Sequence, residues 1–199
     1  NMAQNRQYLA SMLRNLIKQG FDVRYLATAC GSCRDSLARM KLNEQFPQLE
    51  QKDVSQIVLP LLQHESMEAP VAPGTNVLYH AACHCEWAGV PTLKGQAQLT
   101  GALEQLCKVK VSTIPGCCGE SGMGAVTSPT IYNLLRARKK ERLAKAFEPQ
   151  PQTGACYAGP ILVGCPSCKI GIARCLIQLK EKHPVLHVLE WLANQVGGE

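Results

Sequence analysis

The sequence lacks long apolar runs. None of its segments reaches the length, about 18 apolar residues, that a membrane-spanning helix needs. The first 20 residues also lack the uninterrupted apolar core and the small-residue cleavage site of a signal peptide, and their apolar positions repeat at helical spacing. Aromatic residues make up only 5% and charged residues 18% of the 199 residues, against 46% hydrophobic residues. This composition predicts a soluble globular protein with one large or two small cores.

The positive charge of the chain is modest, with a formal net charge of +6. Its densest part is the segment RARKKERLAK at residues 136–145. The helical spacing of this segment predicts a solvent-exposed helix face, with docking of an acidic partner or of phospholipid headgroups as alternatives. No aromatic residues are interleaved with the basic ones, so nucleic acid is not expected as a partner. The sequence also shows no Ser–His–Asp grouping and no paired carboxylates that would indicate hydrolysis.

Cysteine is the abundant residue, with 11 copies in the chain. A secreted disulfide scaffold would explain this number, but such scaffolds are usually shorter and poor in helices. Here the cysteines lie among long helix and strand patterns, and their number is odd. These features favour a reducing compartment, the cytoplasm, and a metal or redox role for the thiols.

Strand and helix patterns alternate along the chain, which predicts an α/β fold with a Rossmann-like, open and mostly parallel sheet flanked by helices. Strands are expected within 21–29, 76–83, 108–115 and 160–165, and a short strand followed by a helix within 184–195. Other helices are expected over 5–19, 32–42, 54–65, 95–107, 130–147 and 169–182. Ser128 and Pro129 form a typical helix start, and Asp53 is a candidate cap.

Two segments repeat the order of apolar strand, Cys-x-x-Cys and helix: YLATACGSCRDSL and ILVGCPSCKIGIA. We interpret this repeat as an internal duplication whose first copy is truncated, so the chain is expected to be the C-terminal part of a longer protein. The expected division is 1–68 for the end of a first domain, 69–75 for a linker and 76–199 for a complete second domain.

Within the second unit, five cysteines follow three predicted strands: Cys83, Cys117, Cys118, Cys165 and Cys168. Because the carboxyl ends of parallel strands share one edge of a sheet, we expect these thiols at one site. Zinc prefers four tetrahedral ligands, and the adjacent Cys117 and Cys118 are a poor pair for one small ion. An iron–sulfur cluster is larger and offers different irons to neighbouring thiolates, and glycines around 116–124 let backbone amides approach it. Iron–sulfur ligation is therefore favoured, with zinc binding and thiol–disulfide chemistry as alternatives.

The segments YHAACH, GCCGESGMG and VGCPSCKIGI resemble the cysteine-rich CCG domain. That domain occurs in heterodisulfide reductase and in the iron–sulfur components of glycolate, D-lactate and anaerobic glycerol-3-phosphate dehydrogenases. The resemblance covers residues 76–192 as one domain and 5–65 as the end of another. It implies that the five cysteines bind a [4Fe-4S] cluster, which is noncubane in heterodisulfide reductase. It also implies that Cys30 and Cys33 are half of a second site.

The chain departs from the family pattern in three places. Ala81 and Ala82 stand where the family often has Asp-Pro, and the interval between the cysteine pair and the last Cys-x-x-Cys is longer than usual. Cys85 and Cys156 are additional cysteines. These departures leave open which thiols are ligands.

The resemblance implies an electron-transfer module of a flavin-linked dehydrogenase that oxidises a 2-hydroxy acid or glycerol 3-phosphate. Electrons would pass from FAD, on a partner or upstream domain, through the cluster to a quinone or another carrier. The expected partners are therefore a flavoprotein domain or subunit and that carrier, with peripheral membrane association at the inner face through a partner. Two alternatives stay open: disulfide reduction at the cluster, as in heterodisulfide reductase, and a structural zinc module. In each case the chain is expected to be a component of an oxidoreductase or an interface rather than a complete enzyme.

Histidines and further cysteines near these motifs have simpler explanations. His80 and His84 flank Cys83, and a strand histidine is more often a hydrogen-bonded packing residue than a metal ligand, with contact to the cluster from behind its ligands as the alternative. Cys107 and Cys175 lie on apolar helix stripes and are expected in the core.

Overall fold

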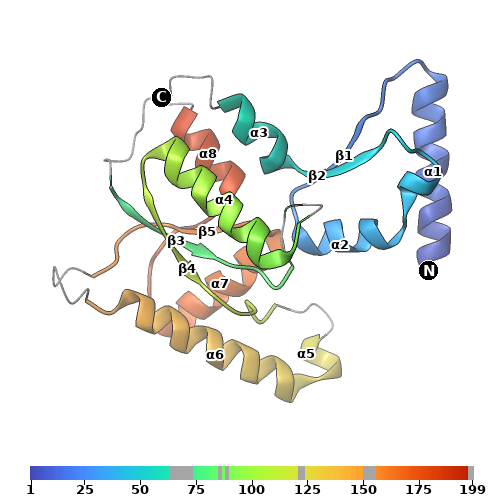
Figure 1. Cartoon of the computed structure of the whole chain (residues 1–199). Coiled ribbons are helices and arrows are strands. Elements are labelled where there is room, and N and C mark those ends of the chain that lie inside the picture. The colour runs from blue at the N-terminus through green and yellow to red at the C-terminus, as the bar shows by residue number, and fades with distance from the viewer. Residues whose placement is uncertain (63–73, 85–86, 88–89, 121–123, 150–155, 197–199) are drawn as a thin grey trace.

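The computed structural model describes residues 1–62, 74–84, 87, 90–120, 124–149 and 156–196 (Figure 1). Parallel strands alternate with helices along the chain, which confirms the expected α/β fold with flanking helices. Within the described residues, no helix is both long and apolar enough to cross a membrane. The N-terminal elements are α1 (Met2–Lys18), β1 (Tyr25–Thr28), α2 (Gly31–Arg39), η1 (Leu42–Glu44), β2 (Glu50–Asp53) and α3 (Val54–Leu62). The C-terminal elements are β3 (Asn76–His80), α4 (Thr92–Cys107), β4 (Lys110–Ile114), α5 (Gly124–Thr127), α6 (Pro129–Phe147), β5 (Ile161–Val163), α7 (Pro166–Leu179), β6 (Val185–His187) and α8 (Val188–Val196).

The larger sheet has the strand order β4–β3–β5–β6, with every pair parallel. Its register places Leu78 of β3 between Ser112 of β4 and Ile161 of β5. The chain moves from β3 to β4 on one side and then returns past β3 to β5 on the other. The carboxyl ends of β3 and β5 therefore flank the point where the strand order reverses, which is where open parallel sheets bind their ligands.

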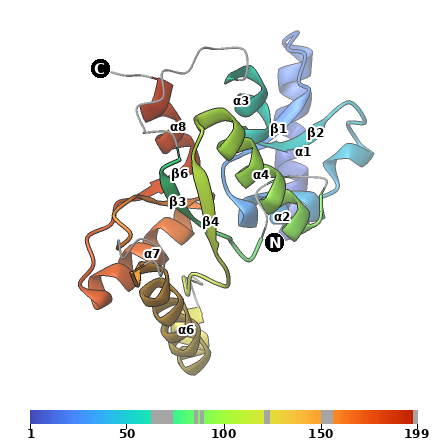
Figure 2. The same ribbon diagram turned by 60° about the vertical axis from the view of Figure 1, so that its left-hand side comes forward.

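Each face of the larger sheet carries its own core. Figures 1 and 2 show α4 and α8 on one side of the sheet and α6 and α7 on the other. Because strand side chains alternate between faces, Val77 and Tyr79 pack in the α4–α8 core while Leu78 packs in the α6–α7 core. The α6–α7 core also contains Cys118, Cys165 and Cys168, so three of the expected ligand cysteines are part of the packed interior.

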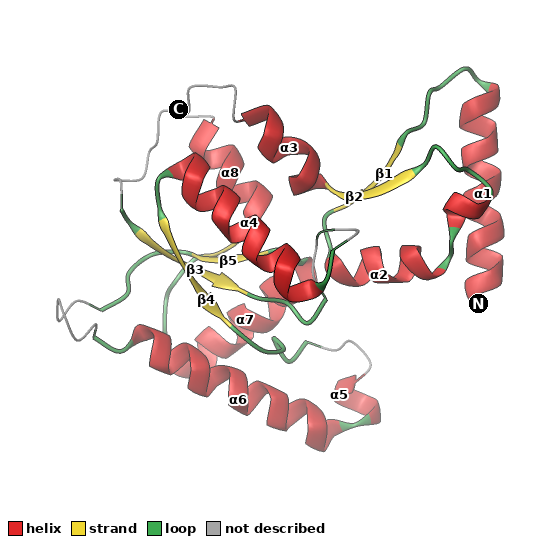
Figure 3. Cartoon of the chain, viewed as in Figure 1, coloured by secondary structure: helices red, strands yellow, loops and turns green. Residues whose placement is uncertain are grey.

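The smaller sheet is the parallel pair β1–β2, shown in yellow beside α1 and α2 in Figure 3. Its own core joins α1 to the segment after α2, through Ala10, Leu13, Met40, Leu42, Phe46 and Leu49. Strand β2 was not expected, because its sequence EQKD is polar and lacks the apolar alternation of a half-buried strand. Pairing with β1 makes it a strand, a tertiary effect that local patterns do not show.

Several local predictions are confirmed and others change. Helix α6 begins at Pro129 after Ser128, although the Ser128 side chain makes no capping hydrogen bond. Asp53 receives a hydrogen bond from the Ser55 amide (2.8 Å) at the start of α3. The short helix α5 was not expected within the glycine-rich region. Most of the expected linker, residues 69–73, lies outside the described residues, and the division of the chain at 68 and 75 stays a prediction.

Candidate metal centre

Three strand ends of the larger sheet carry the five cysteines of the predicted site. Strand β3 ends at His80, three residues before Cys83, and β4 runs directly into the turn that contains Cys117 and Cys118. Strand β5 leads to Cys165, whose extended backbone (φ −149°, ψ 130°) precedes the first turn of α7. Pro166 suits that first turn because its φ is already helical and it has no amide hydrogen to satisfy.

The turn around the adjacent cysteines depends on two glycines with positive φ. Gly116 (φ +86°) and Gly119 (φ +75°) bracket Cys117 and Cys118, a conformation that L-residues with side chains rarely adopt. A Cβ atom on Gly119 would lie 2.4 Å from Cγ of Arg136 on α6. The turn therefore packs its backbone directly against α6, which holds the two thiols at the sheet edge.

The five thiols form one hydrogen-bonded series instead of separate pairs. Cys83 is hydrogen-bonded to Cys117, Cys117 to Cys118, and Cys118 to Cys168, which in turn is hydrogen-bonded to Cys165. The three buried members are no more than 4% exposed, while Cys83 at the start of the series is exposed. The expectation that sulfurs from three strand ends meet at one place agrees with this geometry, and their role as ligands stays a prediction.

The electrostatics of the series favour thiolates at two positions. Hydrogen bonds from Cys118 and Cys83 hold the pKa of Cys117 far below its ordinary value. A hydrogen bond from Cys168 lowers the pKa of Cys165 to about 5. The pKa values of Cys83 and Cys118 are raised by their hydrogen bonds with Cys117. The pKa of Cys168 is raised by its hydrogen bonds with Cys118, the largest cause, and with Cys165. Since the thiolate is the form that binds metals, Cys117 and Cys165 are the members of the series whose metal-binding form is favoured.

Backbone amides also point at the sulfur atoms. The amide of Gly119 lies 3.4 Å from Sγ of Cys117, and the amide of Glu120 lies 3.4 Å from Sγ of Cys118. Such N–H groups stabilise negative charge on sulfur without side-chain chemistry. The approach of backbone amides in the stretch 116–124 to a bound cluster stays a prediction, and residues 121–123 of that stretch lie outside the described residues.

His80 and Lys139 extend the site into the core. The side-chain ligand atoms of His80, Cys118 and Cys168 all lie within 4.8 Å of one another, and all three residues are buried. Nζ of Lys139 lies 3.0 Å from Nδ1 of His80 and 2.8 Å from the carbonyl oxygen of Pro115. On the other side of the ring, Nε2 of His80 is buried and has no hydrogen-bond partner among the described residues. His80 therefore lies beside two of the five thiols, and its contact with a cluster stays a prediction.

The expectation that residues 136–145 form an exposed face is wrong for Lys139, which is only 1% exposed. A signal for its burial was present in the sequence. Lys139, Leu143 and Phe147 are spaced four residues apart, and these three are the buried residues of α6. The lysine thus continues an apolar helix stripe, and the site beyond it supplies the polar partners that a buried ammonium needs.

The first Cys-x-x-Cys reaches the same site. Sγ of Cys30 lies 3.4 Å from Sγ of Cys165, so the thiol series continues into the N-terminal unit. Burial, the largest cause, raises the pKa of Cys30 to about 12. Cys33 is exposed, although it remains close enough to hydrogen-bond to Cys30. The predicted half-site therefore lies next to the five-cysteine site, and its role as a second site stays a prediction.

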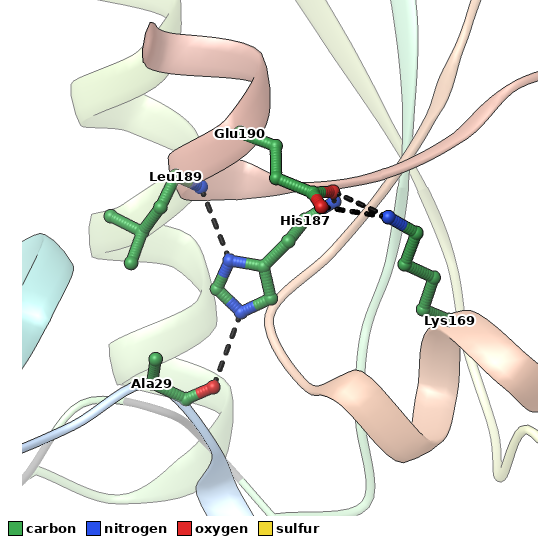
Figure 4. A network of polar contacts seen from close by, with 5 residues as sticks. All are labelled: Ala29, Lys169, His187, Leu189 and Glu190. Atoms are coloured by element: carbon green, nitrogen blue, oxygen red, sulfur yellow. Dashed lines mark hydrogen bonds and ion pairs between the residues drawn. The ribbon is translucent and has the colours of Figure 1, made fainter.

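A polar network holds the end of β1 against β6 (Figure 4). The amide of Leu189 donates to Nδ1 of His187 (3.2 Å), so Nε2 carries the proton and donates to the carbonyl oxygen of Ala29 (3.2 Å). Glu190 accepts from the His187 amide and pairs with Lys169 of α7 (2.7 Å for both). Because Ala29 precedes Cys30, this network fixes the position of the Cys30 thiol.

The other cysteines and histidines named in the sequence analysis differ in their burial. Cys107 and Cys175 are 2% and 0% exposed, as expected for core residues. Cys156 is exposed, and Cys85 lies outside the described residues. His84 is half-buried, and no part of the described site uses it.

The polar groups at this site are thiols, two backbone amides and one buried imidazole, and all of them lie at the carboxyl edge of a parallel sheet. Soft sulfur ligands of this kind select zinc, copper(I) or iron–sulfur clusters, so the fold and site define a thiol-rich metal-binding module. The family model of the cysteine-rich domain CCG matches residues 77–173. That segment contains all five cysteines, most of β3 and all of β4 and β5, and it matches the cysteine-rich CCG family, as the sequence motifs indicated. No curated protein and no solved structure matches the chain.

Proposed function

We propose that this CCG domain binds a [4Fe-4S] cluster through Cys83, Cys117, Cys118, Cys165 and Cys168 and transfers electrons for a flavin-linked dehydrogenase. The observation that carries the proposal is the single thiol series built from three strand ends. A lone zinc ion needs four ligands in one tetrahedral shell, whereas this series offers five sulfurs in a row. A cluster with several irons can use sulfurs that are spread out in this way.

The burial of the thiols supports electron transfer as the role of the cluster. Cys118, Cys165 and Cys168 lie in the α6–α7 core, and Cys83 lies at the exposed end of the series. When bound, an iron–sulfur cluster supplies one-electron chemistry, and the chain contributes ligation, burial and hydrogen bonds that set its potential. The exposed end at Cys83 is the natural place for exchange with a flavoprotein partner or a quinone. We place FAD on that partner, and a 2-hydroxy acid or glycerol 3-phosphate as its substrate.

The test is anaerobic purification and reconstitution, followed by counting of iron, acid-labile sulfide and zinc. We expect iron and sulfide in equal amounts with the absorption and electron paramagnetic resonance of a [4Fe-4S] cluster. Cys118→Ser should lose most of the iron. Cys156→Ser, which removes an exposed thiol outside the series, is the matched control and should retain it. Zinc alone, at full occupancy and without sulfide, would contradict the proposal and support a structural module.

A second candidate is disulfide reduction at the cluster. It is favoured by Cys83, whose exposure leaves one end of the series open to a small molecule. Reductant-loaded protein would be mixed with a low-molecular-weight disulfide, and thiol release would be compared with the rate of cluster oxidation by a quinone analogue. If the disulfide oxidises the cluster and thiol is released at the same rate, disulfide reduction is favoured. If the quinone analogue oxidises the cluster and the disulfide does not, electron transfer is favoured.

A further inference from the structure

We propose that His80 is a hydrogen-bond donor to the sulfur atoms of the metal centre, not one of its ligands, and that Lys139 fixes it in that role. The inference deepens the proposed iron–sulfur function and rests on it. His80 and Lys139 are thereby positioning residues, which act on the centre through one N–H group.

The first step is the direction of the hydrogen bond between the two side chains. Nζ of Lys139 lies 2.8 Å from the carbonyl oxygen of Pro115 and 3.0 Å from Nδ1 of His80. An ammonium group only donates, so Nδ1 is the acceptor. A neutral imidazole that accepts at Nδ1 carries its hydrogen at Nε2. The buried lysine thus selects the Nε2–H tautomer of His80.

The position of Lys139 favours its ammonium form. Nζ donates to the carbonyl oxygen of Pro115, and while burial lowers the pKa of this side chain, the negative charge of Cys118 and Cys168 raises it. Thiolates or an anionic cluster next to it strengthen that preference, because opposite charges at short range in a buried site stabilise each other.

The second step is the destination of the Nε2–H group. Nε2 is buried and has no partner among the described residues, and one ring nitrogen of His80 lies within 4.8 Å of Sγ of Cys118 and Sγ of Cys168. A buried N–H without an acceptor is costly, and with Nδ1 held by Lys139 the two nearby sulfur atoms are the acceptors that the inference assigns to Nε2. The same nitrogen cannot bind a metal while it carries a hydrogen, which is why the buried group of three contains two ligands and a donor.

The expected consequence is a higher reduction potential. Hydrogen bonds to the sulfur atoms of a cluster stabilise the more negative, reduced state. The positive charge of Lys139 behind the imidazole acts in the same direction. Removal of either group is therefore expected to lower the potential and leave the five thiols in place.

The tautomer can be measured before any metal is bound. Nitrogen-15 NMR of histidine-labelled, reduced, metal-free protein is expected to show His80 with its hydrogen on Nε2, assigned by loss of the signal in His80→Gln. Lys139→Met should release the ring into a mixture of tautomers. Lys145→Met removes an exposed lysine from the same helix and should leave the signal unchanged. A hydrogen on Nδ1 in the natural protein would overturn the inference, whichever metal the protein binds.

The reconstituted protein gives the second readout. His80→Phe and Lys139→Met are expected to keep the iron content of the natural protein and to shift the reduction potential to more negative values, while His80→Gln, which retains an N–H donor, restores part of the shift. Loss of iron from folded His80→Phe would make His80 a ligand and overturn the inference. An unchanged potential would also overturn it. If the protein binds only zinc, the proposed function fails while the tautomer measurement still decides this inference.

Discussion

In both units of this chain a short parallel strand ends at a cysteine that begins a helix. Cys30 and Cys165 have nearly the same backbone conformation, with φ and ψ of −162° and 120° for Cys30 and −149° and 130° for Cys165. Their surroundings differ. Strand β5 lies between β3 and β6 and is buried throughout. In the part of the chain that the structure describes, β1 pairs with β2 alone, and Thr28 is its one buried residue. As a result, Cys168 is buried and the equivalent Cys33 is exposed.

This difference shows that the Cys-x-x-Cys motif alone does not make the site. In both copies the first cysteine of the motif is the N-cap residue of a helix that follows a short strand. The buried thiol series needs the neighbouring ends of β3 and β4, which only the C-terminal unit supplies among the described residues. The following variants test this comparison between equivalent positions.

The largest effect, on iron content, is expected from replacing the equivalent cysteines Cys168 and Cys33 one at a time with serine. Cys168→Ser should reduce bound iron by at least about tenfold, because it interrupts the series between Cys118 and Cys165. Cys33→Ser should leave the iron content close to that of the natural protein. Both are measured by iron and sulfide analysis after anaerobic reconstitution. Equal losses in the two variants would show that both motifs hold the same cluster.

The two sheets should differ in their contribution to stability. Ile161 of β5 is fully buried, and Ile161→Ala is expected to lower the free energy of unfolding by about 2–5 kcal/mol. Leu26 of β1 is only half-buried, and Leu26→Ala should cost about 1 kcal/mol. Denaturant unfolding of the metal-free, reduced protein gives both values. A larger loss for Leu26→Ala would mean that the smaller sheet carries more of the stability than its burial indicates.

The turns of the two units contain glycines with similar positive φ and different neighbours. Gly119→Ala should lower the free energy of unfolding by about 2–3 kcal/mol, since the new Cβ combines an unfavourable φ with a contact of 2.4 Å to Arg136. Gly20→Ala, with φ +89° and nothing within 4 Å, should cost only about 1 kcal/mol. Unfolding measurements on both variants isolate the packing contribution, and equal losses would show that α6 does not confine the turn.

The smallest effect concerns Asp53, the buried residue at the carboxyl end of β2. Burial, which outweighs hydrogen bonds from Ser55, raises the pKa of this carboxyl group above its ordinary value of 3.8. The folded state therefore holds this proton more tightly than the unfolded state, and stability declines as pH rises from 3.8 through the folded-state pKa. In Asp53→Asn that decline should be absent. The check is the difference in unfolding free energy between the two proteins across this pH range, and a constant difference would contradict the prediction.

Much of the site could be predicted, because strand ends and cysteine spacing are local features. The positions of Cys83, Cys117, Cys118, Cys165 and Cys168 follow from three apolar strands that end at one edge of a parallel sheet. The fold class followed from the same alternation of patterns.

Other parts depended on contacts that no local pattern contains. Strand β2 is polar and becomes a strand only by pairing with β1. Lys139 lies in a basic segment and is buried only because α6 packs over β3 and the turn after β4. The contact between Cys30 and Cys165 joins residues from two sheets, which periodicity within either segment does not relate.

The sequence by itself determined the elements and the chemistry: apolar strands, helix starts at Pro129 and Pro166, and thiols at the strand ends. The tertiary structure alone decided which thiols are buried and in what order they contact one another. It also decided that Lys139 and His80 are buried next to them. The physical reason is range. Backbone preferences act over a few residues, whereas burial and hydrogen bonding between strands depend on segments that are far apart along the chain.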